Sequence, residues 1–160
     1  MRKVVVNSTP LIALCKVGKL ELLKLCYQEI IIPQAVYSEI CAKNDAVEKQ
    51  IRNNLSWIHI VSVQSDSDKK MYKAKLHAGE VEVMILAQEI DADLVIIDDG
   101  PARKTAEYLG LKLTGTIGTL IMAKQNGDLN AVMPVIDAIK ENGFHIDGKL
   151  ESMVRKLAGE

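Results

Sequence analysis

The chain has 160 residues, of which 48% are hydrophobic and 26% charged, a balance typical of globular domains and far from that of disordered chains. This length suits a single hydrophobic core, so we expect one domain over residues 1–160. The formal net charge of −1 excludes recognition of nucleic acid through an overall positive field, which leaves a local patch or metal ions as the means.

The three cysteines, Cys15, Cys26 and Cys41, lack the spacing of a zinc site or a disulfide framework. We therefore expect reduced thiols in a cytoplasmic protein. The sequence starts without a signal-peptide pattern, and its longest apolar runs are much shorter than the ~20 residues that cross a membrane. No membrane association is expected.

Short runs rich in β-branched residues predict the strands. Four runs lack polar alternation, as is typical of parallel strands that are covered on both faces, and they lie at 3–6, 29–32, 94–97 and, more weakly, 111–114. A fifth run at 57–63 alternates more, which indicates a strand nearer an edge of the sheet.

Helical patterns fill the intervals between these strands. Pro10 and Pro33 stand where first helical turns are expected, because proline is tolerated there. The later helices are predicted at 32–40, 79–90, 101–109, 117–126 and 130–142, with a short one at 149–157 in a C-terminal extension, 143–160. The alternation of strand and helix predicts an α/β fold with a mostly parallel central sheet.

Polar residues follow two of the predicted strands. The first strand ends at Asn7, Ser8 and Thr9, and the strand at 94–97 ends at Asp98 and Asp99. Ligands of open parallel sheets bind outside the carboxyl ends of the strands. Adjacent carboxylates there need compensation, and Mg²⁺ or Mn²⁺, which prefer carboxylate oxygens, would supply it. Capping of the helix that begins near Pro101 explains the two aspartates equally well.

Two glutamates extend this group of candidates. Glu39 lies on the flank of the apolar stripe of its helix, although for this residue alone a solvated surface position is the favoured interpretation. Glu80 falls on an apolar side of the helix at 79–90, which indicates a buried polar neighbour, and an N-terminal cap is the alternative. Glu82 and Glu89 share the polar face of that helix and are expected to be ordinary surface charges.

The ordered set of motifs "NSTPLIAL", "IPQAVYSEI", "GEVE", "IDDGPAR" and "GLKLTGT" resembles that of PIN-domain proteins. The likeness runs from about residue 4 to 127 and is nearest to a predicted nucleic-acid-binding branch similar to VapC-type toxins. It implies a three-layer α/β/α domain in which acids from separate segments hold Mg²⁺ or Mn²⁺ and cleave single-stranded or structured RNA. Similar proteins often form homodimers and toxin–antitoxin pairs, which implies a small antitoxin partner.

The resemblance assigns the acidic positions of the family residue by residue. The first falls on Asn7, the second on Glu39 and the third on Glu80. The fourth falls on Asp98 or Asp99, between which the sequence does not choose. These residues are the expected metal ligands, and the four acids the expected catalytic groups. The departure is Asn7, where the family usually carries aspartate, since an amide oxygen ligates Mg²⁺ without adding negative charge.

The same resemblance suggests residues that would contact the substrate. Ser8 and Thr9 match the small hydroxyl residues after the first position, and Thr114 and Thr116 are expected to line the same cleft. Arg103 and Lys104 follow the acidic pair and are candidate phosphate contacts, although solvated helix charges explain them equally well.

Three functions remain open from the sequence. The first is metal-assisted hydrolysis of RNA. The second is a catalytically weakened PIN-like module that binds RNA or protein, for which Asn7 is the best support. The third is a nucleotide-binding or phosphoacceptor α/β domain, which is disfavoured because no glycine-rich phosphate loop is present.

Overall fold

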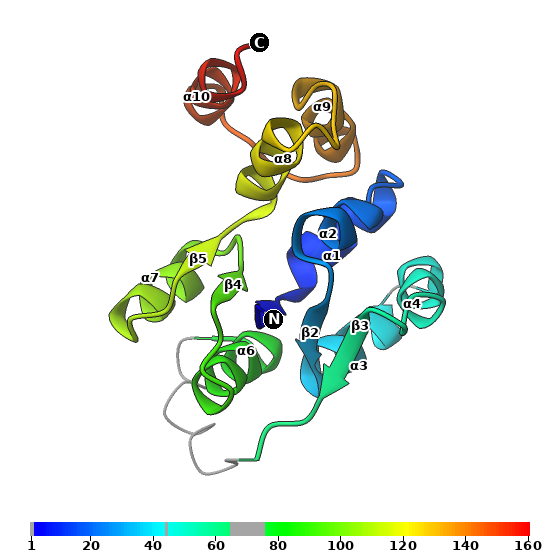
Figure 1. Cartoon of the computed structure of the whole chain (residues 1–160), viewed down its shortest axis with the longest axis vertical. Coiled ribbons are helices and arrows are strands. Elements are labelled where there is room, and N and C mark those ends of the chain that lie inside the picture. Colours follow the sequence, from blue (N-terminus) through cyan, green and yellow to red (C-terminus); the bar gives the residue numbers. More distant parts are fainter. Residues whose placement is uncertain (1, 44, 65–75) are drawn as a thin grey trace.

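The computed structural model describes residues 2–43, 45–64 and 76–160. In this part of the chain, five parallel strands form one sheet in the order β3-β2-β1-β4-β5 (Figure 1). Their bounds are β1 Val4–Val6, β2 Ile30–Pro33, β3 Ile58–Val61, β4 Leu94–Ile96 and β5 Leu113–Thr114. All five strands expected from the sequence are confirmed, and β3 lies at an edge as its alternating pattern indicated.

The centre of the sheet is made by β1 and β4. Val6 of β1 is in register with Ile96 of β4, and all residues of both strands are buried. Covered on both faces, these strands need no polar side chain along their length, which explains their unbroken apolar runs.

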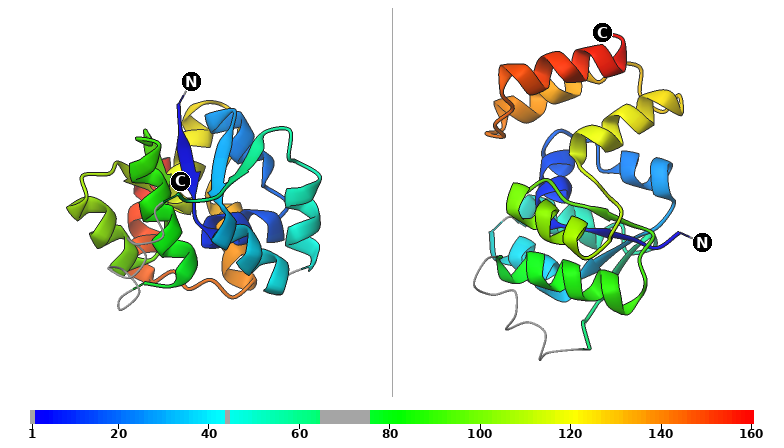
Figure 2. Two further views of the ribbon diagram at one scale, coloured as in Figure 1. Left: turned by 90° about the horizontal axis from the view of Figure 1, so that it is seen from below. Right: turned by 90° about the vertical axis from the view of Figure 1, so that its left-hand side faces the viewer.

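The described residues form nine helices, which cover both faces of the sheet and give three layers, α/β/α (Figure 2). Their bounds are α1 Ser8–Lys16, α2 Glu21–Tyr27, α3 Gln34–Lys43, α4 Asp45–Arg52, α6 Ala78–Glu89, α7 Gly100–Tyr108, α8 Thr116–Gln125, α9 Met133–Glu141 and α10 Gly148–Ala158. The helices expected from residue 79 onward are therefore confirmed to within a few residues.

The helices pack in two sets that are joined by α1, which contacts α3 and α4 as well as α8 and α9. Helix α3 packs against α1, α4 and α6, and α6 also contacts β1 and β2. Helix α2 instead packs against α8, and α8 contacts β5 and α10. The apolar helix α6 has buried side chains all round except on one narrow face, because it lies between the sheet and α3.

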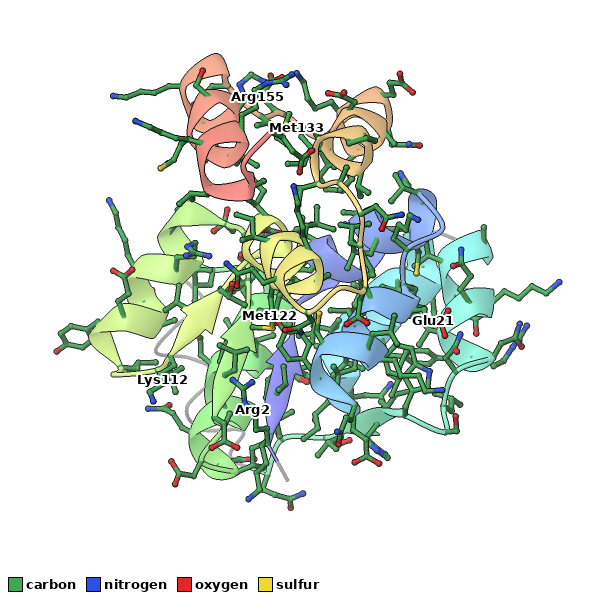
Figure 3. The ribbon with its side chains drawn as sticks, turned by 45° about the horizontal axis from the view of Figure 1, so that its top comes forward. Arg2, Glu21, Lys112, Met122, Met133 and Arg155 are labelled. Carbon is green, nitrogen blue, oxygen red and sulfur yellow. The ribbon has the colours of Figure 1, made fainter. Side chains whose placement is uncertain are left out.

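The last three helices lie together at one end of the molecule, where Figure 3 labels Met122 on α8, Met133 on α9 and Arg155 on α10. Glu160 joins them: its carboxylate accepts hydrogen bonds from Val132 N at 2.8 Å and Met133 N at 3.1 Å, at the start of α9. Lys124 of α8 lies 2.9 Å from the same carboxylate. These bonds hold the pKa of Glu160 at about 2.

Two details of the sequence interpretation were wrong. Pro33 is the last residue of β2 instead of lying in the first turn of α3, a shift of one position at a strand–helix junction. Glu82 is half-buried and is not an ordinary surface charge, whereas Glu89 is exposed as expected. Glu82 accepts a hydrogen bond from Ala35 N at 3.0 Å, at the start of α3, and Glu89 accepts one from Gln64 N at 2.9 Å. Helical periodicity shows which face is polar but not which backbone donors approach it.

The three cysteines are free thiols, as expected. Cys15 is buried, and this burial raises its pKa to about 12, so it is no nucleophile. Among the described residues, no helix has both the length and the apolar character required to span a lipid bilayer.

Candidate active site at the carboxyl ends of β1 and β4

The chain leaves β1 and β4 in opposite directions along the sheet, since β1 is followed by β2 on one side and β4 by β5 on the other. Such a switch point opens a crevice at the carboxyl ends of the two strands. The residues that follow these strands, Asn7 and the pair Asp98–Asp99, therefore lie at the same edge of the sheet. Asn7 N donates to Ile96 O at 3.0 Å, which ties the two strand ends together.

Asn7 is buried and incompletely bonded. Its side chain is 3% exposed and precedes the first residue of α1 without capping that helix through its side chain. Among the described residues, its Oδ1 is the only buried side-chain oxygen or nitrogen that lacks a hydrogen-bond partner. An unpaired buried acceptor costs about 1–3 kcal/mol, so this oxygen is a strong candidate for a ligand atom.

Glu80 is also buried, with 7% of its surface exposed in the first turn of α6. Its Oε1 accepts a hydrogen bond from His77 N at 3.1 Å. Burial raises the pKa of Glu80, and the nearby carboxylate of Asp99 raises it further by repulsion and by a hydrogen bond to the protonated form; the bond from His77 opposes this rise. The fold thus places two acids from distant segments against each other.

Asp98 and Asp99 have different surroundings although they are adjacent in the chain. Asp98 Oδ1 accepts from Thr116 N at 2.8 Å and Asp98 Oδ2 from Thr116 Oγ1 at 2.6 Å, at the start of α8. Asp99 caps α7 through a bond from Ala102 N at 3.1 Å to its Oδ2, and it remains exposed and close to Glu80. Both aspartates therefore bond the first turn of a helix, but only Asp99, the N-cap of α7, faces another acid.

Glu39 lies on α3, opposite the first turn of α6. Its Oε1 is 3.4 Å from Lys43 Nζ, and about 30% of its side chain is exposed. A Cβ added to Gly79, the residue before Glu80, would lie 3.2 Å from Glu39 Oε2, so Glu39 reaches the first turn of α6. It lines a groove of about 590 Å³ between α3 and α6, together with His77 and Glu82.

The two candidate phosphate contacts, Arg103 and Lys104, differ in whether the protein already bonds them. Arg103 Nη1 donates to Ile97 O at 2.8 Å, so this guanidinium is anchored to the end of β4. Lys104, in the first turns of α7, is exposed. Of the two, Lys104 is the side chain available to a phosphate group.

The candidate hydroxyl residues lie in different surroundings. Thr9 and Thr116 line a small cavity together with Asp98, and Ser8 is 7% exposed. Thr114 Oγ1 instead lies against Gly118 in α8, where no side chain would fit between them.

A family model for the PIN domain matches residues 3–160. The chain belongs to the PIN-domain family. The PIN domain is in general a nuclease-type fold that binds nucleic acid. No curated protein matches this chain significantly.

The donors at the site of this PIN domain suit a hard divalent ion. They are the unpaired amide oxygen of Asn7 and the carboxylates of Glu80 and Asp99, all of them oxygens of the kind that Mg²⁺ and Mn²⁺ prefer. In the part of the chain that the structure describes, no three His, Cys, Asp or Glu side chains form a group that could bind a metal ion. A divalent ion would therefore need the amide oxygen of Asn7 as one of its three ligands. These ligands carry less negative charge than three carboxylates would.

One residue that shapes the site of the PIN domain was missed in the sequence. A Cβ on Gly115 would lie 2.6 Å from Asp98 Oδ1 and 3.2 Å from Arg103 Nη1, so only glycine lets Asp98 reach the start of α8. The signal was a glycine between the two threonines of "TGT", directly after a short strand.

Proposed function

We propose that this PIN domain is a Mg²⁺- or Mn²⁺-dependent ribonuclease in which Glu80, Asp99 and Asn7 hold the ion. The observation that carries the proposal is the buried carboxylate of Glu80 next to Asp99, at the strand end where Asn7 keeps an unpaired oxygen. Two like charges in a half-buried setting are unfavourable without a cation. A bound divalent ion would supply Lewis-acid stabilisation of phosphate charge and a water nucleophile of lowered pKa.

The side chains of the site have separate roles in holding the ion and in contacting the phosphate. Glu80 is oriented by the bond from His77 N, and Asp99 by its cap of α7, so both carboxylates are fixed before an ion binds. Asn7 contributes an oxygen but no charge, which lowers the repulsion that a phosphate group meets at this edge. Lys104 would contact the phosphate backbone, whereas Arg103 supports the end of β4 through Ile97 O.

The backbone also favours an anionic substrate. Helices α1, α7 and α8 each begin within four residues of the end of a strand, so their N-terminal ends lie at the same edge as the acids. The N-terminal ends of helices carry partial positive charge and attract phosphate groups. This local field provides the attraction that a protein of net charge −1 lacks as a whole.

The test measures RNA cleavage and metal binding in parallel. Purified protein is mixed with RNA and Mn²⁺, with Glu80→Gln and Asp99→Asn as variants and Glu107→Gln, an exposed carboxylate of α7, as the matched control. Each site variant should lose about 100-fold in rate or more, and Mn²⁺ should raise the melting temperature of the wild type and of Glu107→Gln but not of Glu80→Gln. Cleavage that resists EDTA or the site substitutions would exclude the mechanism.

The second candidate function is a weakened PIN module that binds RNA or a protein without cutting it, and Asn7 is the observation that favours it. Asn7→Asp separates the two, because a weakened module gains metal affinity and cleavage while a working nuclease already has both. The likeness to VapC-type toxins extends the first proposal to a toxin–antitoxin pair, in which a small antitoxin would cover this edge of the sheet.

A further inference from the structure

A small cavity lies next to the candidate active site, where Asp98 forms part of its wall. It has a volume of about 180 Å³ and lies between α1, α8, α9 and the segment that leads into α10. Most of its wall is aliphatic, with Ala13, Ile117, Ile136 and Ile139 among the lining residues. Typical sites for drug-sized ligands measure about 300–1,000 Å³, so this smaller cavity suits one planar base or one side chain.

The end of the cavity nearest the sheet is polar. It is formed by Thr9, Asp98 and Thr116, which follow the ends of β1, β4 and β5 respectively. The cavity is therefore continuous with the strand ends that carry Asn7 and Asp99. Of the lining residues, Asp98 is adjacent to Asp99 in the chain and Thr9 is two residues after Asn7.

The outer wall comes from the segment before α10. Phe144, Ile146 and Leu150 line it and are half-buried, and the exposed His145 stands at its rim. Phe144 is the only phenylalanine of the chain. An aromatic ring in an aliphatic slot is a surface on which a nucleobase stacks.

We infer that this cavity binds one nucleobase of the RNA substrate and that Asp98 makes guanine the preferred base. The inference rests on the proposed function, since it places the base beside the phosphate that the nuclease would cleave. Phe144 and the isoleucines provide the apolar contact. Asp98 provides the hydrogen bonds.

The preference for guanine follows from the bonds of Asp98. A carboxylate has about four lone-pair sites, and Thr116 uses two of them, one on each oxygen. The remaining sites are acceptors only, so they select a base with neighbouring N–H donors. Guanine presents two such donors on its Watson–Crick edge, N1–H and the N2 amino group, whereas uracil presents a single one flanked by two acceptor oxygens.

The first experiment uses the unmodified protein without metal. Protein with carbon-13-labelled isoleucine methyl groups is titrated in EDTA with guanosine monophosphate and, separately, uridine monophosphate. We expect methyl shifts at Ile136, Ile139 and Ile146 but none at Ile51 or Ile58, which are buried elsewhere. Guanosine monophosphate should bind at least about fivefold more tightly, the lower limit for a good base contact.

Variants of Phe144 and Asp98 test whether these residues contact the base. Phe144→Ala should weaken binding at least about fivefold through lost stacking, and Tyr108→Ala, which removes an aromatic ring that is 91% exposed on α7, should not. Asp98→Asn keeps the shape of the side chain but replaces an acceptor oxygen with a donor, so the preference for guanosine monophosphate should disappear.

The outcomes separate this inference from the proposed nuclease activity. Metal-dependent cleavage of RNA without methyl shifts in the cavity would overturn the base site, keep the nuclease, and leave an apolar side chain of a protein partner as the occupant. Shifts with no cleavage would support the base site and count against the nuclease. Equal binding of the two nucleotides would overturn the role of Asp98.

Discussion

The two sides of the carboxyl edge of the sheet use the same kind of residue in opposite ways. On the side of α8, both oxygens of Asp98 are bonded to Thr116, so that carboxylate is stabilised by the protein itself. On the side of α6, Asp99 faces Glu80, and Asn7 follows the neighbouring strand with an unpaired oxygen. An acid that the protein itself bonds needs no cation, whereas an acid that meets another acid indicates a cation site.

The largest expected effect comes from adding a charge at the unpaired position. Asn7→Asp places a carboxylate in a site that is 3% exposed and offers no donor to Oδ1. In EDTA the variant should lose about 3–5 kcal/mol of unfolding free energy, and Mn²⁺ should restore most of it. Urea unfolding in EDTA and in Mn²⁺ measures the loss and the recovery of unfolding free energy. Asn53→Asp, at an exposed position, is the control; equal stability of the two variants in EDTA would contradict a buried, donor-free site.

A comparison of the two aspartates tests the contrast directly. Asp98→Ala removes two hydrogen bonds and the support of the start of α8, so it should cost about 2–3 kcal/mol in urea unfolding. Asp99→Ala removes one cap bond but relieves the repulsion of Glu80, so its cost should stay below about 1 kcal/mol. A larger loss of stability for Asp99→Ala than for Asp98→Ala would show that Asp99 is the structural anchor instead of Asp98.

Gly115→Ala tests how closely Asp98 approaches α8. The new Cβ would lie 2.6 Å from Asp98 Oδ1, which must move, so the substitution should destabilise by about 1–2 kcal/mol. Combined with Asp98→Ala, its cost should shrink, since the clash partner is gone. Gly148→Ala, where the added Cβ meets no atom within 4 Å, should be close to neutral in the same assay.

The smallest effect concerns the pH dependence of the metal-free protein. The pKa of Glu80 is raised in the fold by burial and by Asp99, so the folded state binds this proton more tightly than the unfolded state. Stability should therefore fall as pH rises from the unfolded value through the raised one, and the penalty persists above it. Glu80→Gln should remove this slope and melt slightly higher at neutral pH, while Glu107→Gln should follow the wild type. A lower melting temperature for Glu80→Gln would contradict the repulsion.

Most of the fold could be predicted from the sequence because its signals are local. The runs of valine and isoleucine identify the parallel strands, and helical periodicity identifies α6 to within a residue. Glu80 was also recognised, because an acid on an apolar side of a helix violates the local pattern. Glu82 was misjudged, since its partner, Ala35 N, is 47 residues away and leaves no trace in the helix that carries Glu82.

The sequence by itself determined the α/β class, the strand ends at which polar groups gather, and the presence of an amide at position 7. These follow from burial and periodicity, which act over a few neighbouring residues. Only the tertiary structure decided that Asp99 rather than Asp98 faces Glu80, because that depends on which helix start each side chain meets. Thr116 and Glu80 come from different segments, and only their packing around the ends of β1 and β4 gives two adjacent aspartates different environments.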